Sequence, residues 1–163
     1  MHNFIYQLSD QPLEKQDWIN QETFTPEQLD CADYLMDIDA EERRRILQHF
    51  PLPKRYFSRA EDGSDRLTYT TDLREEKNDW VRRIRLVLHQ LEDEDGYKHA
   101  DGYITSMRRI MFDMLDCWGD YFVVNKDGRI SCPLNSTEFV IWATENLKVG
   151  DTLHICGVVD YHW

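Results

Sequence analysis

The last extended segment of the chain carries the side chains best suited to chemistry. In a β-strand, alternate residues point to the same face of the sheet. Between residues 154 and 162, imidazole, thiol and carboxylate groups recur at this spacing, while Leu153, Ile155 and Val159 occupy alternate positions. The pattern predicts a strand with one apolar face and one polar face. Four candidate site residues share the predicted polar face: His154, Cys156, Asp160 and His162.

These residue types could bind zinc, because imidazole and thiolate are common zinc ligands. One ion cannot reach all of them, since His154 and His162 would lie about 27 Å apart at ~3.3 Å per residue. The alternatives are a His154–Cys156 pair or an Asp160–His162 pair, each completed by ligands from elsewhere. No second pair with metal-ligand spacing is found in the sequence. We therefore expect neither a metal nor another cofactor, with these pairs as the fallback candidates.

His154 and Cys156 could instead act as base and nucleophile in a small metal- or thiol-dependent hydrolase. Thiol chemistry requires a lowered thiol pKa and a third group that orients the imidazole. A residue such as His89, His99 or Asp101 would have to converge on the strand at an open pocket. Because a buried, unreactive cysteine is the commoner case, the hydrolase is the alternative hypothesis.

An acidic run follows the longest predicted helix and is the candidate binding segment. Such a run could attract a cation or a basic partner, although many acidic runs only keep a loop hydrated. It consists of Glu92, Asp93, Glu94 and Asp95.

The common signatures of nucleotide and hydrolase chemistry are absent. The chain has no phosphate-binding P-loop, dinucleotide-binding motif, serine-hydrolase elbow or zinc-protease motif. Its seven glycines leave little room for a Gly-rich phosphate cradle. Catalysis by residues that belong to no common motif is still possible, but we favour a protein that is not an enzyme.

The charge balance points to a different class of function. The chain has 19 Lys and Arg against 31 Asp and Glu, a formal charge of −12 at pH 7. Such a field opposes binding to nucleic-acid phosphates. The arginine runs are predicted to be solvated helix faces, because Glu41 lies four residues before Arg45 and charges at that spacing can pair. We predict a non-enzymatic protein-binding domain, of inhibitor, immunity or adaptor type, with a basic protein partner.

Cysteine usage and hydropathy indicate the compartment. The four cysteines contain no CxxC pair, which favours free thiols over a disulfide framework. The first residues lack the basic and apolar segments of a secretory signal. The longest apolar run, Phe139–Ala143, is far shorter than the ~18 residues of a membrane helix. We expect a soluble cytoplasmic protein without membrane association.

The elements that must position these side chains follow from periodicity and turn residues. Alternation predicts single strands at residues 3–8 and 152–161. Turn-rich sequences between apolar pairs predict hairpins at residues 55–71 and 121–132. Helical spacing with capping residues predicts helices at residues 25–36, 39–50, 72–91, 103–118 and 135–147.

Strands and helices come in clusters instead of strict alternation. This order predicts an α+β fold with a mainly antiparallel sheet of about five to six strands packed against about four to five helices. No repeat or linker divides the chain, so residues 1–163 are predicted to form one domain. The oligomeric state is not determined, because Trp18, Phe24 and Trp163 could be covered by the chain's own core or by the second subunit of a homodimer.

Overall fold

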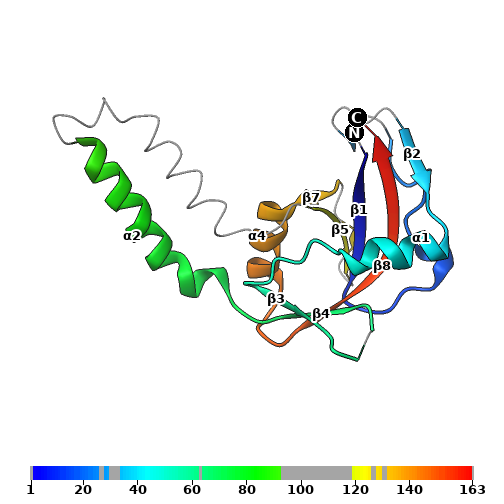
Figure 1. Ribbon diagram of the computed structural model, residues 1–163. Helices are drawn as coiled ribbons and strands as arrows, with labels where there is room; N and C mark the ends of the chain where they lie inside the picture. Colours follow the sequence, from blue (N-terminus) through cyan, green and yellow to red (C-terminus); the bar gives the residue numbers. More distant parts are fainter. Residues whose placement is uncertain are drawn as a thin grey trace.

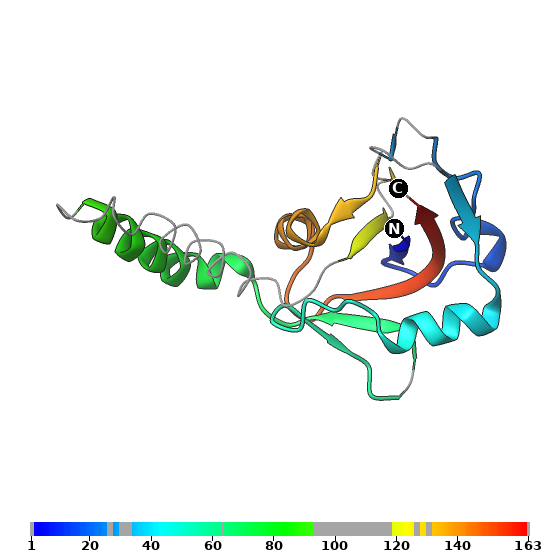
Figure 2. The same cartoon turned by 45° about the horizontal axis from the view of Figure 1, so that its top comes forward.

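The computed structural model describes residues 2–25, 28–29, 34–62, 64–92, 119–125, 128–129 and 132–162. These residues form an α+β fold with an eight-stranded sheet (Figure 1). The sheet is strongly curved, as the view in Figure 2 shows, and resembles half of a barrel. None of the described helices is both long and apolar enough to cross a membrane.

The last strand, β8 (Thr152–His162), is the spine of the sheet. β1 (His2–Ser9) runs antiparallel along one edge of β8, and β5 (Asp120–Asn125) runs parallel to β1 on its far side. The other edge of β8 pairs with β4 (Arg66–Tyr69) near its start and with β2 (Tyr34–Asp37) near its end. The first and the last strand therefore lie side by side in the centre of the sheet.

Three short strands complete the two sides of the sheet. β3 pairs with β4, and β6 and β7 both pair with β5, so the strand order is β3-β4-β8-β1-β5-β6 with β2 and β7 off this path. Their bounds are Phe57–Arg59 for β3, Gly128–Arg129 for β6 and Leu134–Asn135 for β7.

The helices begin where the capping residues predict. α1 (Ala40–Gln48) is capped by Asp39, whose side chain accepts hydrogen bonds from two amides of the first turn. α4 (Ser136–Asn146) begins with a capping box between Asn135 and Glu138. α2 (Leu73–Glu92) extends away from the sheet (Figures 1 and 2). A short 3-10 helix, η1 (Lys15–Asp17), lies beside β8 and α1.

The predicted fold class is wrong in strand number, helix number and strand direction. The sheet has eight strands and is mixed, because β1 and β5 are parallel. The described part of the chain holds three α-helices, and the helix predicted at residues 103–118 lies outside it. Local alternation identifies a strand but says nothing about its direction. The β1–β5 pairing joins residues as distant in the chain as Ile5 and Asp120.

The helix predicted at residues 25–36 is wrong at its end, which is strand β2. Tyr34–Asp37 pairs antiparallel with the end of β8, and the ring of Tyr34 stacks on His162 with centroids 5.1 Å apart. At the predicted start, the Thr25 amide donates to Gln28 Oε1, and residues 26–27 and 30–33 lie outside the described residues. Pairing with a distant strand overrides a local apolar spacing that fits a helix.

The sheet buries an apolar cluster on each face. The larger cluster lies under α1 and α4, where Phe139 stacks on Phe57 and Tyr121 with centroids 5.0 and 4.4 Å apart. The smaller cluster lies under the irregular segment that follows β1, and Phe24 packs there on Phe122. Phe24 is thus buried by its own chain.

A β-bulge interrupts β8 at its middle. The register with β1 shifts by one residue between Tyr6 and Leu8, so Cys156 and Gly157 together lie opposite Gln7. An extra residue in one strand reverses the alternation of its side chains beyond the bulge. On one face of the sheet, the first half of β8 therefore places its odd-numbered side chains and the second half its even-numbered ones.

The side chain of Gln7 holds this bulge. Gln7 is 1% exposed, and its Oε1 accepts hydrogen bonds from the amides of Gly157 and Ile19, both at 3.0 Å. Its Nε2 donates to the carbonyl of Asp17 at 3.1 Å. A Cβ on Gly157 would lie 2.8 Å from both Gln7 Oε1 and the Ile19 amide, so this position requires glycine.

We expect Gln7→Met to lower the free energy of unfolding strongly. Methionine has a similar size but leaves the two buried amides without their acceptor, at a cost of about 1–3 kcal/mol for each. Urea unfolding followed by circular dichroism measures the change. Gln11→Met, at an exposed position, should change stability by less than about 0.5 kcal/mol. Equal stability of the two variants would show that the bulge does not need the carboxamide.

Candidate functional site

The bulge separates the four candidate residues of β8. On β1, Ser9 and Phe4 point to opposite faces because their numbers differ in parity. His154 lies opposite Ser9, whereas Asp160 lies opposite Phe4, and His162 shares the face of Asp160. The prediction that all four residues share one face is therefore wrong. The register shift that reverses the alternation arises from β1 and is invisible in the sequence of β8.

His154 and Cys156 lie on the same half of β8 but are not arranged as base and nucleophile. Cys156 is buried, and its Sγ contacts the backbone carbonyl of His154 at 3.6 Å, not the imidazole. Burial raises the pKa of the Cys156 thiol by more than the Leu13 amide and the Arg43 charge lower it. The thiol is therefore protonated near neutral pH, which disfavours nucleophilic attack.

Neither candidate metal pair is completed by further ligands in the part of the chain that the structure describes. No three His, Cys, Asp or Glu side chains gather there as a metal ion requires. His89 belongs to the outer part of α2, which extends away from β8 (Figure 1). His99 and Asp101 lie outside the described residues. The metal and catalytic roles of the β8 residues stay predictions.

The predicted acidic binding run falls at the limit of the described chain. Glu92 is the last residue of α2. Asp93, Glu94 and Asp95 lie outside the described residues, so their role stays a prediction.

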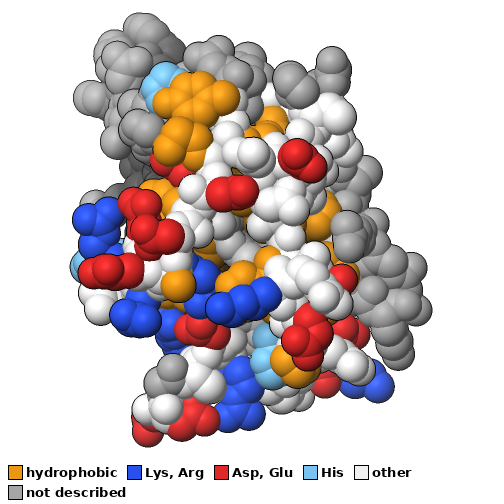
Figure 3. Space-filling view, turned by 90° about the vertical axis from the view of Figure 1, so that its right-hand side faces the viewer, with side chains coloured by type: hydrophobic (Ala, Val, Ile, Leu, Met, Phe, Trp, Pro, Cys, Tyr) orange, Lys and Arg blue, Asp and Glu red, His pale blue; other side chains and the backbone are white. Residues whose placement is uncertain are grey.

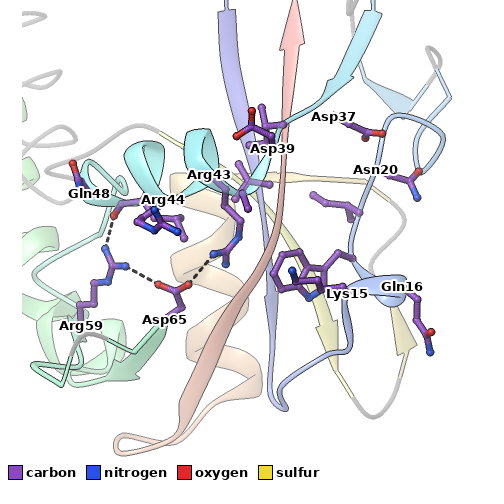
Figure 4. A pocket seen from close by; sticks show the side chains of 16 residues that line it. Lys15, Gln16, Asn20, Asp37, Asp39, Arg43, Arg44, Gln48, Arg59 and Asp65 are labelled. Atoms are coloured by element: carbon purple, nitrogen blue, oxygen red, sulfur yellow. Dashed lines mark hydrogen bonds and ion pairs between the residues drawn. The ribbon is translucent and has the colours of Figure 1, made fainter.

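A pocket of about 850 Å³ opens between η1, α1 and the hairpin of β3 and β4 (Figure 4). It lies on the edge of β8 that β2 and β4 leave uncovered between them, and Val158 of β8 forms part of its wall. The aromatic ring of Trp18 and four cationic side chains line it: Lys15, Arg43, Arg44 and Arg59.

Arg43 is the central residue of this pocket. Its Nε and Nη2 donate to the backbone carbonyls of Cys156 and Ile155, both at 2.9 Å, and its Nη1 donates to Asp65 at 2.9 Å. The guanidinium lies 4.7 Å from the ring centroid of Trp18, a cation–π distance. Arg43 thus fixes α1 to the bulge of β8 and holds one wall of the pocket.

Asp65 joins a second arginine to this network. Its two carboxylate oxygens accept from Arg43 and from Arg59, each at 2.9 Å. Arg59 also donates to the backbone carbonyl of Leu47 at the end of α1. The hairpin of β3 and β4 is therefore attached to α1 by a carboxylate shared between two guanidinium groups.

The role of Arg43 was not predicted from the sequence. The arginine run was expected to be solvated, with a Glu41–Arg45 pair, but Arg45 pairs with Glu42 and the side chain of Arg43 is only 16% exposed. One signal was present. Arg43 lies three and four residues before Ile46 and Leu47, so it shares the buried face of the helix.

A second surface lies at strand β2. Tyr34 and Met36 are 46% and 45% exposed and lie two residues apart, hence on one face of the strand. Acidic residues follow at once, at Asp37, Asp39 and Glu41. Figure 3 shows apolar side chains gathered above acidic ones on this side of the molecule, with Lys and Arg lower down. No strand among the described residues pairs with the outer edge of β2.

A half-buried carboxyl group lies at the start of β5, beside the first half of β1. Asp120 Oδ2 accepts hydrogen bonds from Tyr161 at 2.6 Å and from Asn3 at 3.0 Å. Burial raises the pKa of Asp120, the Tyr161 hydrogen bond partly opposes this, and the charge of Glu138 adds to the rise. The group stabilises the fold best when it is protonated.

No protein-family model matches this chain, and neither curated protein sequences nor solved structures show significant similarity to it. Two features of the structure itself point to a function. One is strand β2, whose outer edge pairs with no described strand, and the other is the pocket around Arg43.

We expect the two described free thiols to differ in reactivity. Cys132 is exposed and Cys156 is buried, so iodoacetamide should alkylate Cys132 at least about tenfold faster near neutral pH. Peptide mass spectrometry resolves the two sites, and the rates should converge in denaturant. Faster labelling of Cys156 would instead support the thiol-hydrolase hypothesis.

We expect Asp120→Asn to increase stability at neutral pH relative to acidic pH. The folded-state pKa of Asp120 is raised, so its contribution is most favourable below the unfolded pKa of ~3.9 and is lost as pH rises through the folded value. The amide cannot ionise but still accepts from Tyr161. The stability difference between variant and wild type should grow from about pH 4 to pH 7. Asp17→Asn, at an exposed position, is the control, and an equal slope for both variants would contradict the assignment.

Proposed function

We propose that this protein is a non-enzymatic protein-binding domain, of inhibitor, immunity or adaptor type. In this proposal an extended basic segment of a protein partner docks along strand β2. The observation that carries it is the outer edge of β2, with which no described strand pairs, and the exposed side chains of Tyr34 and Met36 beside an acidic stretch.

An extended peptide could pair with β2 as an added strand, and the side chains of Tyr34 and Met36 would then contact it. The outer edge of a terminal strand presents amide and carbonyl groups that an extended peptide can pair with. Tyr34 and Met36 would supply side-chain contacts on one face of the added strand. Tyrosine offers a large amphipathic surface, and methionine adapts to irregular partners. His162, stacked under Tyr34, holds that ring in place.

Charge supports a basic partner. The whole chain carries −12, and Asp37, Asp39 and Glu41 continue directly from β2. Opposite charge on the partner would speed encounter and set its register more than it would raise affinity. The predicted run Glu92–Asp95 is a second candidate contact for the same basic partner.

No specific observation favours the hydrolase alternative, because the bulge and the raised thiol pKa oppose the arrangement that it needs. A cytoplasmic location is part of the proposal, supported by Cys132 and Cys156 as free thiols. The competing occupant of β2 is a second copy of this chain, which would make a homodimer.

A defined peptide tests the docking surface. We expect a peptide of about ten residues, with lysine alternating with valine, to bind and to shift the amide NMR signals of β2. The double variant Tyr34→Ser/Met36→Ser should weaken binding at least about tenfold, as loss of two central anchors does. The matched control is Ile141→Ser/Val149→Ser, because those residues are 44% and 55% exposed elsewhere on the surface. It should bind like the wild type.

Three outcomes would contradict this proposal. Equal weakening in both double variants would place the peptide elsewhere. Binding unchanged between about 50 and 500 mM salt would remove its electrostatic basis. A dimer in sedimentation that dissociates in the Tyr34→Ser/Met36→Ser variant would assign β2 to a second copy of the chain.

A further inference from the structure

We propose that the pocket between η1 and α1 binds a small organic phosphate. The phosphate group would be held by Lys15, Arg44 and the free N–H groups of Arg43. This site adjoins the docking edge of β2 and shares Asp37 and Asp39 with its acidic continuation. The residues that would hold the phosphate are not those that would contact the peptide, so neither proposal depends on the other.

The pocket concentrates positive charge in an acidic protein. Its lining contains four cationic side chains and three carboxylates, those of Asp37, Asp39 and Asp65. The local formal charge is thus +1, whereas the whole chain carries −12. In Figure 4, Arg43 lies between Arg44 on one side and Lys15 on the other. An anion would find several cationic donors there and would be repelled by most of the remaining surface.

The carboxylates of the pocket are engaged by internal donors. Asp39 caps α1, Asp37 accepts from the Gln21 amide at 2.7 Å, and Asp65 is shared by two arginines. By contrast, Lys15 and Arg44 make no ion pair with any residue that the structure describes. Their charges therefore remain available to a ligand.

Internal hydrogen bonds hold the guanidinium of Arg43 in position before any ligand binds. A guanidinium carries five N–H groups, and three hydrogen bonds to Cys156, Ile155 and Asp65 leave two without an acceptor among the described residues. The same three bonds fix the plane of the group, and its Cζ lies 4.7 Å from the ring centroid of Trp18. A guanidinium held in this way loses little side-chain entropy when an anion binds.

The size and walls of the pocket favour an organic phosphate over a bare ion or a polymer. About 850 Å³ is within the range of small-ligand sites and far larger than one phosphate ion needs. Trp18, Ile38 and Val158 provide apolar wall for an organic group, and the amides of Gln16 and Gln48 provide hydrogen-bond partners. A nucleic-acid backbone would require a longer basic track than this acidic surface offers.

The test uses inorganic phosphate and phenyl phosphate as probes, at about 150 mM salt to screen distant charges. Binding is followed by NMR at the indole N–H of Trp18, which donates to the Leu13 carbonyl at 3.2 Å. A Trp18→Phe variant assigns that signal. We expect saturable shifts with both probes and tighter binding of phenyl phosphate, because its ring adds apolar contact.

Paired charge variants decide where the anion binds. Lys15→Gln/Arg44→Gln should weaken phenyl phosphate binding at least about tenfold, since two charge-assisted contacts are lost. Arg45→Gln/Lys148→Gln makes the same charge change outside the pocket and should alter binding by less than about twofold. Thermal unfolding should show that both variants fold like the wild type.

The proposal is overturned by any of three results. The first is no saturable shift at Trp18 up to about 10 mM probe, because a specific organic phosphate site should saturate below that concentration. The second is equal weakening in the two charge variants, which would indicate a non-specific field effect. The third is tighter binding of a short DNA oligonucleotide than of phenyl phosphate, which would indicate a nucleic-acid surface.

Discussion

The carboxamide of Gln7 joins three backbone segments at the centre of the molecule. It accepts from β8 at Gly157 and from the irregular segment at Ile19, and it donates to Asp17 at the end of η1. These bonds stabilise a bulge that would otherwise leave buried amides without acceptors. They also hold the irregular segment against the smaller apolar cluster, where Phe24 and Ile19 cover β1 and β5. The face presented by each half of β8 depends on this one side chain.

The pocket depends on the same bulge. Arg43 binds the carbonyls of Ile155 and Cys156, where no described strand pairs with β8 between β4 and β2. The guanidinium of Arg43 bonds these carbonyls in place of a strand, and it lies over the ring of Trp18, which follows η1 directly. Asp65 balances part of the charge and ties in the β3–β4 hairpin through Arg59. Arg43 thus has a structural role, and only three of its five N–H groups are used in the hydrogen bonds that fulfil it.

The two candidate surfaces have opposite electrostatic character and lie next to one another. Asp37 is the last residue of β2 and also lines the pocket. The edge strand with its acidic continuation suits a basic polypeptide, while the pocket suits a small anion. Separation of charge over a short distance is achieved because α1 carries acidic residues in its first turn and arginines behind them. The acidic first turn of the helix lies next to β2, and the arginines that follow it lie toward the β3–β4 hairpin.

The sequence by itself determined the local elements of this protein. The caps of α1 and α4, the strands β1 and β8, and the two hairpins follow from residues close together in the chain, where capping, turn chemistry and alternation operate. Only the tertiary structure decided the parallel β1–β5 pairing, the strand at Tyr34–Asp37 and the bulge at Gly157. It also decided that the side chain of Arg43 points toward β8 instead of toward solvent. Each of these depends on contacts between distant segments: β8 supplies the partner for β2, and Gln7 supplies the acceptor for Gly157. The candidate site at β8 was misplaced for that reason, since a single extra residue opposite Gln7 exchanges the two faces of a strand.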